Sequence, residues 1–166
     1  MNAVIVDTNV IVIANDTDDK RADCRDLCQD RLHQIISRRE KVVIDNNWRI
    51  LKEYERNTKP NTRKGIGDVF VKTLLRNQKN ANFCAMVHIT PLAGNGTEFK
   101  EFPTDNALRG FDPDDRKFIA VAIAHQAQFG QTATILLAID SGWTNYITAL
   151  AAHSVDIHSI CEEDTS

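Results

Sequence analysis

A regular exchange between short apolar runs and longer stretches of helical periodicity constrains the fold of this chain more than any other feature. The runs are four to seven residues long, which is the length of β-strands. They read AVIV (3–6), KVVI (41–44), FCAMVHI (83–89), TILLAI (134–139) and SVDIHSI (154–160). The first, second and fourth are apolar almost throughout, which is typical of strands covered on both faces, as in a parallel sheet.

The intervals between the runs carry apolar residues at three- and four-residue spacing, which predicts helices. We expect helices from 18 or 19 to 38, from 45 or 46 to 57, from 66 to 80, from 114 to 130 and from 143 to 152. Gly130 supplies the stop of the fourth helix. Strands that alternate with helices predict an α/β layered fold with right-handed crossovers. Residues 94–110 fit neither pattern and are expected to form a loop or a small hairpin.

The length and composition of the chain indicate one folded domain. Its 166 residues are of one-domain size, so we expect a single domain over residues 1–166. With 42% hydrophobic and 26% charged residues, the composition favours a folded protein over a disordered one. No window approaches the ~18 apolar residues of a membrane helix, and the first residues lack the pattern of a secretory signal. These features predict a cytoplasmic protein without a membrane partner.

The four cysteines are Cys24, Cys28, Cys84 and Cys161. They are too few and too scattered for a disulfide framework. Cys24 and Cys28 have a helical four-residue spacing, but the chain offers no matching second pair that would suggest a zinc site. We therefore expect free thiols that are buried or half-buried.

The chain contains a basic segment although its net charge is −3. Between residues 56 and 79, seven basic residues stand against one acid, Asp68, so this segment carries about +6 and the rest of the chain about −9. We call residues 56–79 the basic strip. Such a strip on an acidic protein indicates local binding of a polyanion, although a solvated helix face is an equally ordinary interpretation.

Asp7 interrupts the apolar run VIVDTNVIV at the point where the first strand is expected to end. In an open parallel sheet, ligands bind beyond the carboxyl ends of the strands, so this carboxylate faces the binding crevice. Asp140 ends TILLAI in the same way, while Glu53 lies on the helix after the second strand and Asp115 opens the helix from 114 to 130. Four converging carboxylates repel one another unless cations neutralise them, and oxygen ligands favour Mg²⁺ or Mn²⁺.

Each acid also has an ordinary structural role to weigh. Asp7 could simply end a strand in a turn, and Asp115 could be a cap or a first-turn acid favoured by the helix dipole. Glu53 competes with Glu55, but residues two apart on a helix point about 200° from each other, so only one of them can face the site. We interpret three further acids as helix caps, namely Asp45, Asp112 and Asp114.

Taken in order, four segments resemble the PIN-domain family, the nuclease fold of many prokaryotic toxins and RNA-processing proteins. The segments are VDTNVIV, VVIDNNWRILKEYE, DPDDRKFIAVAIA and ILLAID. The resemblance covers nearly the whole chain, and it lies in the order and spacing of motifs that are individually common. It implies a three-layer α/β/α fold around a central, mostly parallel, roughly five-stranded sheet. The chain departs from the family pattern at Gly142, where many members carry a further acid.

The resemblance also implies metal-dependent hydrolysis of phosphodiesters, usually in RNA, with Mg²⁺ or Mn²⁺ as the cofactor. The family's metal-binding and catalytic acids correspond to Asp7, Glu53, Asp115 and Asp140, and Asn9 matches the polar residue that often supports the first of them. We therefore expect an endoribonuclease that acts on single-stranded RNA, with the toxin half of a toxin–antitoxin pair as its biological role. The expected partners are RNA, an antitoxin protein and a second copy of the chain.

RNA binding is assigned to the basic strip, whose side chains would hold the phosphate backbone. The assigned residues are Arg56, Lys59, Arg63, Lys64, Lys72 and Arg76. Trp48, Tyr54 and Phe70 lie near the strip and are candidates for stacking on bases, although for Phe70 a place in the core is an equally ordinary interpretation. Two rival functions have less support. A haloacid-dehalogenase-like phosphatase needs a second acid where this chain has Asn9, and a non-catalytic RNA- or protein-binding module leaves the four acids unexplained.

Overall fold

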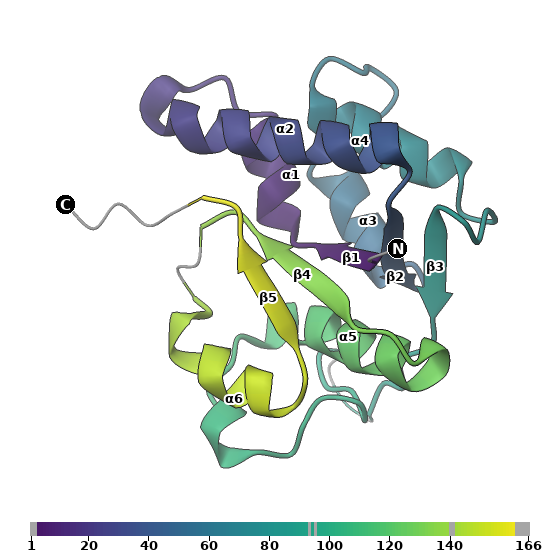
Figure 1. Ribbon diagram of the computed structural model, residues 1–166, viewed down its shortest axis with the longest axis vertical. Helices are drawn as coiled ribbons and strands as arrows, with labels where there is room; N and C mark the ends of the chain where they lie inside the picture. The colour runs from purple at the N-terminus through teal and green to yellow at the C-terminus, as the bar shows by residue number, and fades with distance from the viewer. Residues whose placement is uncertain (1–2, 93, 95, 140–141, 162–166) are drawn as a thin grey trace.

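The computed structural model describes residues 3–92, 94, 96–139 and 142–161 of the chain. Five strands in this part of the chain form one sheet, in which every neighbouring pair is parallel. Their order is β3 (Cys84–Val87), β2 (Lys41–Asp45), β1 (Ala3–Val6), β4 (Ala133–Leu137) and β5 (Asp156–Ser159). Helices cover both faces, so the fold is a three-layer α/β/α sandwich (Figure 1). The expected architecture is confirmed.

The described helices lie in two layers. They are α1 (Thr8–Ala14), α2 (Ala22–Arg38), α3 (Arg49–Arg56), α4 (Ile66–Arg76), α5 (Arg116–Phe129) and α6 (Ile147–Ala152), with short 3-10 turns at Asp19–Arg21, Asn106–Leu108, Pro113–Asp115 and Thr144–Tyr146. In Figure 1, α1, α2 and α4 lie above the sheet and α5 and α6 below it. The helix α3 contacts β2, α1, α4 and α5, so it bridges the two layers. As predicted, α5 ends at Gly130, whose φ of 67° is left-handed.

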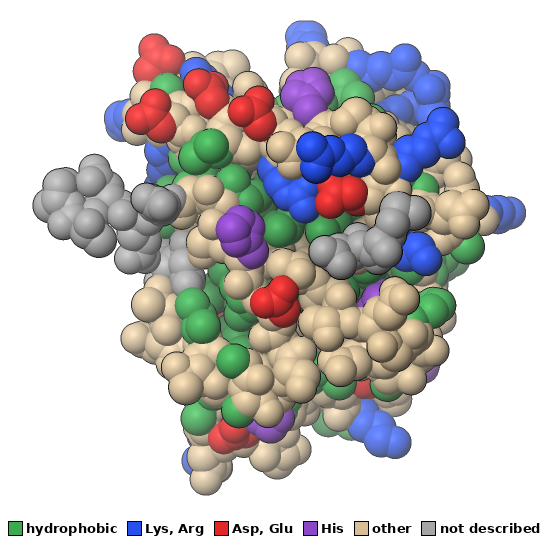
Figure 2. All heavy atoms as spheres, viewed as in Figure 1, with side chains coloured by type: hydrophobic (Ala, Val, Ile, Leu, Met, Phe, Trp, Pro, Cys, Tyr) green, Lys and Arg blue, Asp and Glu red, His purple; other side chains and the backbone are tan. Residues whose placement is uncertain are grey.

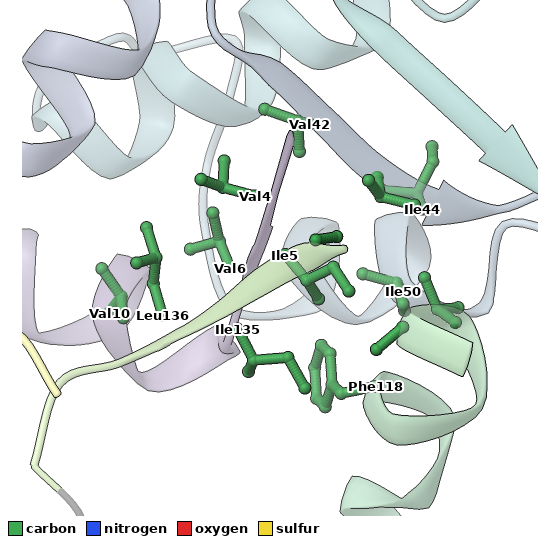
Figure 3. Packing of buried hydrophobic residues seen from close by; sticks show 14 of the residues in the cluster. Val4, Ile5, Val6, Val10, Val42, Ile44, Ile50, Phe118, Ile135 and Leu136 are labelled. Carbon is green, nitrogen blue, oxygen red and sulfur yellow. The ribbon is translucent and has the colours of Figure 1, made fainter. Parts of the chain in front are cut away.

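The three strands predicted to be covered on both faces, β1, β2 and β4, are the interior strands of the sheet. Their side chains alternate between the two helix layers, as the period of a strand requires. Figure 3 shows Val6 on the side of Val10 in α1, whereas Ile5 and Ile135 point toward Phe118 of α5. All five residues are fully buried, so the sheet carries a hydrophobic core on each face.

Two of the four cysteines differ from expectation. Cys24, in the first turn of α2, forms a disulfide with Cys161, which follows β5. The prediction of free thiols is therefore wrong for this pair and is confirmed for Cys28 and Cys84, which are buried. The pairing escaped the sequence argument because 137 residues separate the two cysteines, and nothing local links them.

The segment that fitted neither periodicity, residues 94–110, packs onto the core. An isolated antiparallel bridge at Phe99 gives it a small hairpin, as expected. Phe99, Phe102 and Leu108 are buried. Arg116 lies over the ring of Phe102 and pairs with Glu98 at 2.9 Å, which ties the segment to the start of α5. No helix within the described ranges is long and apolar enough to cross a membrane.

Candidate active site

Asp7 stands at the carboxyl end of β1, where the chain turns into α1. The strand order reverses at this strand, since β2 and β3 lie on one side of it and β4 and β5 on the other. Open α/β sheets bind their ligands at such a switch point. The carboxylate of Asp7 is 7% exposed, and it makes no hydrogen bond that caps α1. An ordinary cap role therefore does not account for it.

Glu53 reaches the same edge of the sheet from α3. The polar residues of this helix recur at three- and four-residue spacing and are Arg49, Lys52, Glu53 and Arg56, while the opposite stripe is buried. The buried Tyr54 donates its hydroxyl to the carbonyl of Val6, the last residue of β1, which holds α3 beside Asp7. Glu55 is exposed. Of the two competing glutamates, Glu53 is therefore the one that faces the cluster.

Asp115 reaches the edge from the other layer. It is the last residue of the 3-10 turn Pro113–Asp115 and directly precedes α5. Asp112 accepts the backbone N–H of Asp114 at 3.0 Å, which confirms Asp112 as a cap. The carboxylate of Asp115 is half-buried and accepts a hydrogen bond from the side chain of Trp143. Its role is therefore separate from capping.

The three carboxylates act on one another electrostatically. The pKa of Asp7 is raised from 3.8 to about 7, first by burial and then by the charges of Asp115 and Glu53. Burial likewise raises the pKa of Asp115 to about 6, with contributions from Asp112 and Glu53. The pKa of Tyr54 is raised well above its usual value by burial first, and then by Asp7 and Glu53. The cluster thus holds more negative charge than its own cations neutralise.

Two residues that the sequence did not single out belong to the same cluster. Lys117, in the first turn of α5, pairs its Nζ with Oε1 of Glu53 at 2.9 Å and also donates to the carbonyl of Asp114. The hydroxyl of Thr8 donates to Oε2 of Glu53. Both residues lie within two positions of a predicted acid in the sequence, which was the available signal. Their contacts tie Glu53 to one residue of α1 and one of α5.

The donor set fits a hard divalent cation. Asp7 and Asp115 are carboxylates whose ionised forms are disfavoured by burial, and a bound cation would relieve that cost. In the described part of the chain, no three carboxylates bring one oxygen each within 4.8 Å of one another. Because Lys117 engages Glu53, that acid would meet an ion through water or after Lys117 has moved. Asp7 and Asp115 are the two described acids best placed to bind directly.

The remaining predicted residues divide as follows. Asp140 lies outside the described residues. Asn9 is exposed, and its backbone N–H opposes the rise in the pKa of Asp7. Asp45 is fully buried at the end of β2, where its carboxylate accepts the backbone N–H groups of Arg49 at 3.1 Å and Ile50 at 3.0 Å. Asp45 therefore accepts the first-turn N–H groups of α3 as a cap does, although the helix begins at Arg49 and its N-cap position is Trp48.

Two adjoining clefts lead away from the cluster. The first, of about 400 Å³, opens beside Glu53. Its basic lining consists of Arg49, Lys52, Arg56 and Lys117. The second, of about 500 Å³, is lined by Lys59 and Lys64 together with Arg56, which lines both clefts. Arg56 therefore connects the carboxylate cluster to the basic strip.

The basic strip forms a charged surface. Figure 2 shows Lys and Arg side chains gathered at the upper right, over α4 and the loop before it. The exposed members of the predicted RNA-binding set are Arg56, Lys59, Arg63, Lys64 and Arg76. Lys72 is half-buried and donates to Asn61 at 2.8 Å. Asp68, the one acid of the strip, is buried and accepts the backbone N–H groups of Lys59 and Gly65, so it organises the loop beneath the cations.

The proposed aromatic stacking set needs correction. Tyr54 and Phe70 are 0% exposed and contact each other in the core, so the prediction that they stack on bases is wrong. Trp48 is 44% exposed and donates its indole N–H to Gln78 at 2.8 Å. The error has a simple cause, because helical spacing also placed Tyr54 and Phe70 on the apolar faces of α3 and α4.

The raised pKa of Asp7 predicts a pH-dependent stability without metal. Between about pH 4 and pH 7, the folded protein binds more protons at Asp7 than the unfolded chain does, so its stability falls as pH rises. Asp7→Asn removes this titration. In EDTA, we expect the variant's free energy of unfolding to exceed that of the wild type by on the order of 2 kcal/mol above pH 7. Urea unfolding should show this difference vanishing near pH 4, and a pH-independent difference would contradict the prediction.

Comparison with known proteins identifies one family. The family model of the PIN domain matches residues 3–129, from β1 to the end of α5. The matched range contains Asp7, Glu53 and Asp115, and it ends before β4 and Asp140. No curated protein and no solved structure matches the chain.

Proposed function

Since the chain belongs to the PIN-domain family, whose fold is of the nuclease type, we propose that it is a metal-dependent endoribonuclease that hydrolyses single-stranded RNA. The observation that carries the proposal is the burial of Asp7 against the charges of Asp115 and Glu53 at the switch point of the sheet. Such an arrangement costs the apo protein stability, and a divalent cation would offset that cost.

The proposed cation is Mg²⁺ or Mn²⁺, which when bound would lower the pKa of a water molecule and stabilise charge on the phosphate. Asp7 and Asp115 would hold it, together with Asp140 according to the sequence pattern. Glu53 would orient a water molecule, since Thr8 and Lys117 fix both of its oxygens.

The protein's own cations would position the substrate. The first cleft carries four basic residues beside Glu53, so a phosphate drawn into it would lie close to that acid. Arg56 continues this lining into the second cleft, where Lys59 and Lys64 would hold the following phosphates. Trp48 is an exposed aromatic residue beside α3 on which an RNA base could stack. This favours single-stranded RNA as the substrate, because its bases are free to stack.

Reversing three charges of the strip tests this path. We expect Arg63→Glu, Lys64→Glu and Lys72→Glu together to weaken RNA binding roughly 10- to 100-fold at ~0.1 M salt, and to reduce the slope of log K against log salt by up to about 2. The measurement is fluorescence anisotropy of labelled RNA over a salt series.

A control triple with the same change of net charge separates local contacts from the overall field. Lys20, Arg21 and Arg38 are exposed on or just before α2, away from both clefts. Reversing them to Glu should leave the salt slope close to that of the wild type. Equal losses in the two triples would remove the strip from the proposed binding path.

The experiment that tests the catalytic proposal is a cleavage assay on single-stranded RNA in Mg²⁺ or Mn²⁺ and in excess chelator, run on the wild-type chain and on Asp7→Asn. A toxin role, an antitoxin partner and a homodimer extend the proposal from the family resemblance alone. Growth arrest on expression of the wild-type chain, absent with Asp7→Asn, would support the toxin role.

A further inference from the structure

Three cysteines from two distant parts of the chain lie close together in the interior of the protein. Cys24 and Cys28 lie one turn apart on α2, and Cys161 follows β5. One sulfur from each lies within 4.8 Å of the other two, and the residues are 8%, 0% and 3% exposed. Cys24 and Cys161 form a disulfide, and Sγ of Cys28 lies 3.9 Å from Sγ of Cys161. The candidate active site uses none of these groups.

We propose that Cys24, Cys28 and Cys161 form a reversible thiol–disulfide site that fastens the C-terminal strand to α2. Its reactants are small or protein disulfides in one direction and dithiols in the other. In oxidation, the thiols of Cys24 and Cys161 form one S–S bond, and their two protons and two electrons convert the incoming disulfide into two thiols. Reduction by a dithiol reverses each of these changes.

The tether acts on a part of the sheet with few other attachments. The strand β5 is an edge strand that pairs with β4, and its residues are half-buried or exposed. Beyond β5, the backbone N–H groups of Ile160 and Cys161 donate to the carbonyls of Leu137 and Ala138 at 2.8 and 2.9 Å. The disulfide therefore lies next to the hydrogen bonds that join Ile160 and Cys161 to the end of β4. In sequence, that end of β4 leads directly to Asp140.

The third cysteine supplies an alternative partner. Cys28 is at van der Waals distance from the sulfur of Cys161, so a bond between them requires a small movement of side chains. Burial raises the pKa of Cys28 to about 12, which keeps this thiol protonated and makes it a slow nucleophile. Cys24, the most exposed of the three, lies in the first turn of α2 and is bonded to Cys161. The structure thus assigns Cys24–Cys161 as the resting pair.

Disulfide mapping tests the assignment. The full chain is oxidised with glutathione disulfide, alkylated and digested without reduction for mass spectrometry. We expect a Cys24–Cys161 cross-link in the wild type, with Cys28 and Cys84 alkylated. In Cys24→Ala, Cys161 should pair with Cys28 instead, and Cys84→Ala should keep the wild-type pattern. Alkylation of both Cys24 and Cys161 in the oxidised wild type, or a cross-link to Cys84, would overturn the proposal.

Reduction of the wild-type chain then tests the fastening role without any mutation. A closed loop of this length predicts that dithiothreitol lowers the melting temperature by roughly 5–15 °C, and that Cys161→Ala shows no further change on reduction. Amide exchange should accelerate in peptides covering residues 156–161 and stay unchanged in those covering 41–45. Equal melting temperatures and equal exchange in the two redox states would show that the bond fastens nothing. Neither readout depends on nuclease activity.

Discussion

We expect Asp7→Asn to abolish RNA cleavage while RNA binding persists or tightens. Asparagine keeps the size of the side chain but removes the negative charge that would hold the cation. Losing that cation should lower the cleavage rate by at least ~10³-fold, which corresponds to about 4 kcal/mol of transition-state stabilisation. Removing one negative charge from the phosphate's path favours binding. Gel analysis of labelled RNA measures the rate, and fluorescence anisotropy measures the affinity.

Chelation and a matched variant complete this test. Excess EDTA should stop the wild-type enzyme, and added Mn²⁺ should restore it. Asp30→Asn makes the same charge change at an exposed position of α2 and should cut at the wild-type rate. Cleavage that survives EDTA, or an Asp7→Asn protein that cuts as fast as the wild type, would rule out the proposed metal-dependent reaction.

The second large effect is on the free energy of unfolding. Replacing an aspartate by asparagine should lower it at Asp45 and raise it at Asp7. Asp45 is the last residue of β2 and Asp7 directly follows β1, and both residues are buried. Asp45 accepts two backbone N–H groups of α3 and lies 3.4 Å from the guanidinium of Arg49. In Asp45→Asn an NH₂ group replaces one acceptor and faces a backbone donor. We expect a loss of roughly 2–4 kcal/mol.

Urea unfolding in EDTA at pH 8 measures the contrast directly. Asp45→Asn should unfold at lower urea concentration than the wild type, and Asp7→Asn at higher concentration. Asp18→Asn is the control, because Asp18 caps the exposed turn Asp19–Arg21 and should cost less than about 1 kcal/mol. If both buried variants shift stability in the same direction, the distinction between a structural and a metal-binding aspartate fails.

The contrast between these two aspartates shows which features of the candidate site could be predicted from the sequence. Both follow an apolar run, and a cap role for Asp45 was predicted from its place before a helix. The separation of Glu53 from Glu55 also followed from helical geometry. Local patterns could not predict that Lys117 would pair with Glu53, because that contact joins α3 to α5 across 64 positions. Contacts of this kind depend on the path of the whole chain.

By itself, the sequence determined where the strands lie, which of them are covered on both faces, and where α5 ends. These features depend on the period of the apolar residues and on a local glycine. It also placed Asp7 after a strand and Asp115 at the start of a helix, and the parallel sheet brings both to one edge. The tertiary structure alone decided that Lys117 meets Glu53 and that Cys24 meets Cys161. Periodicity fixes which face of an element is apolar, whereas packing between distant segments decides what that face meets.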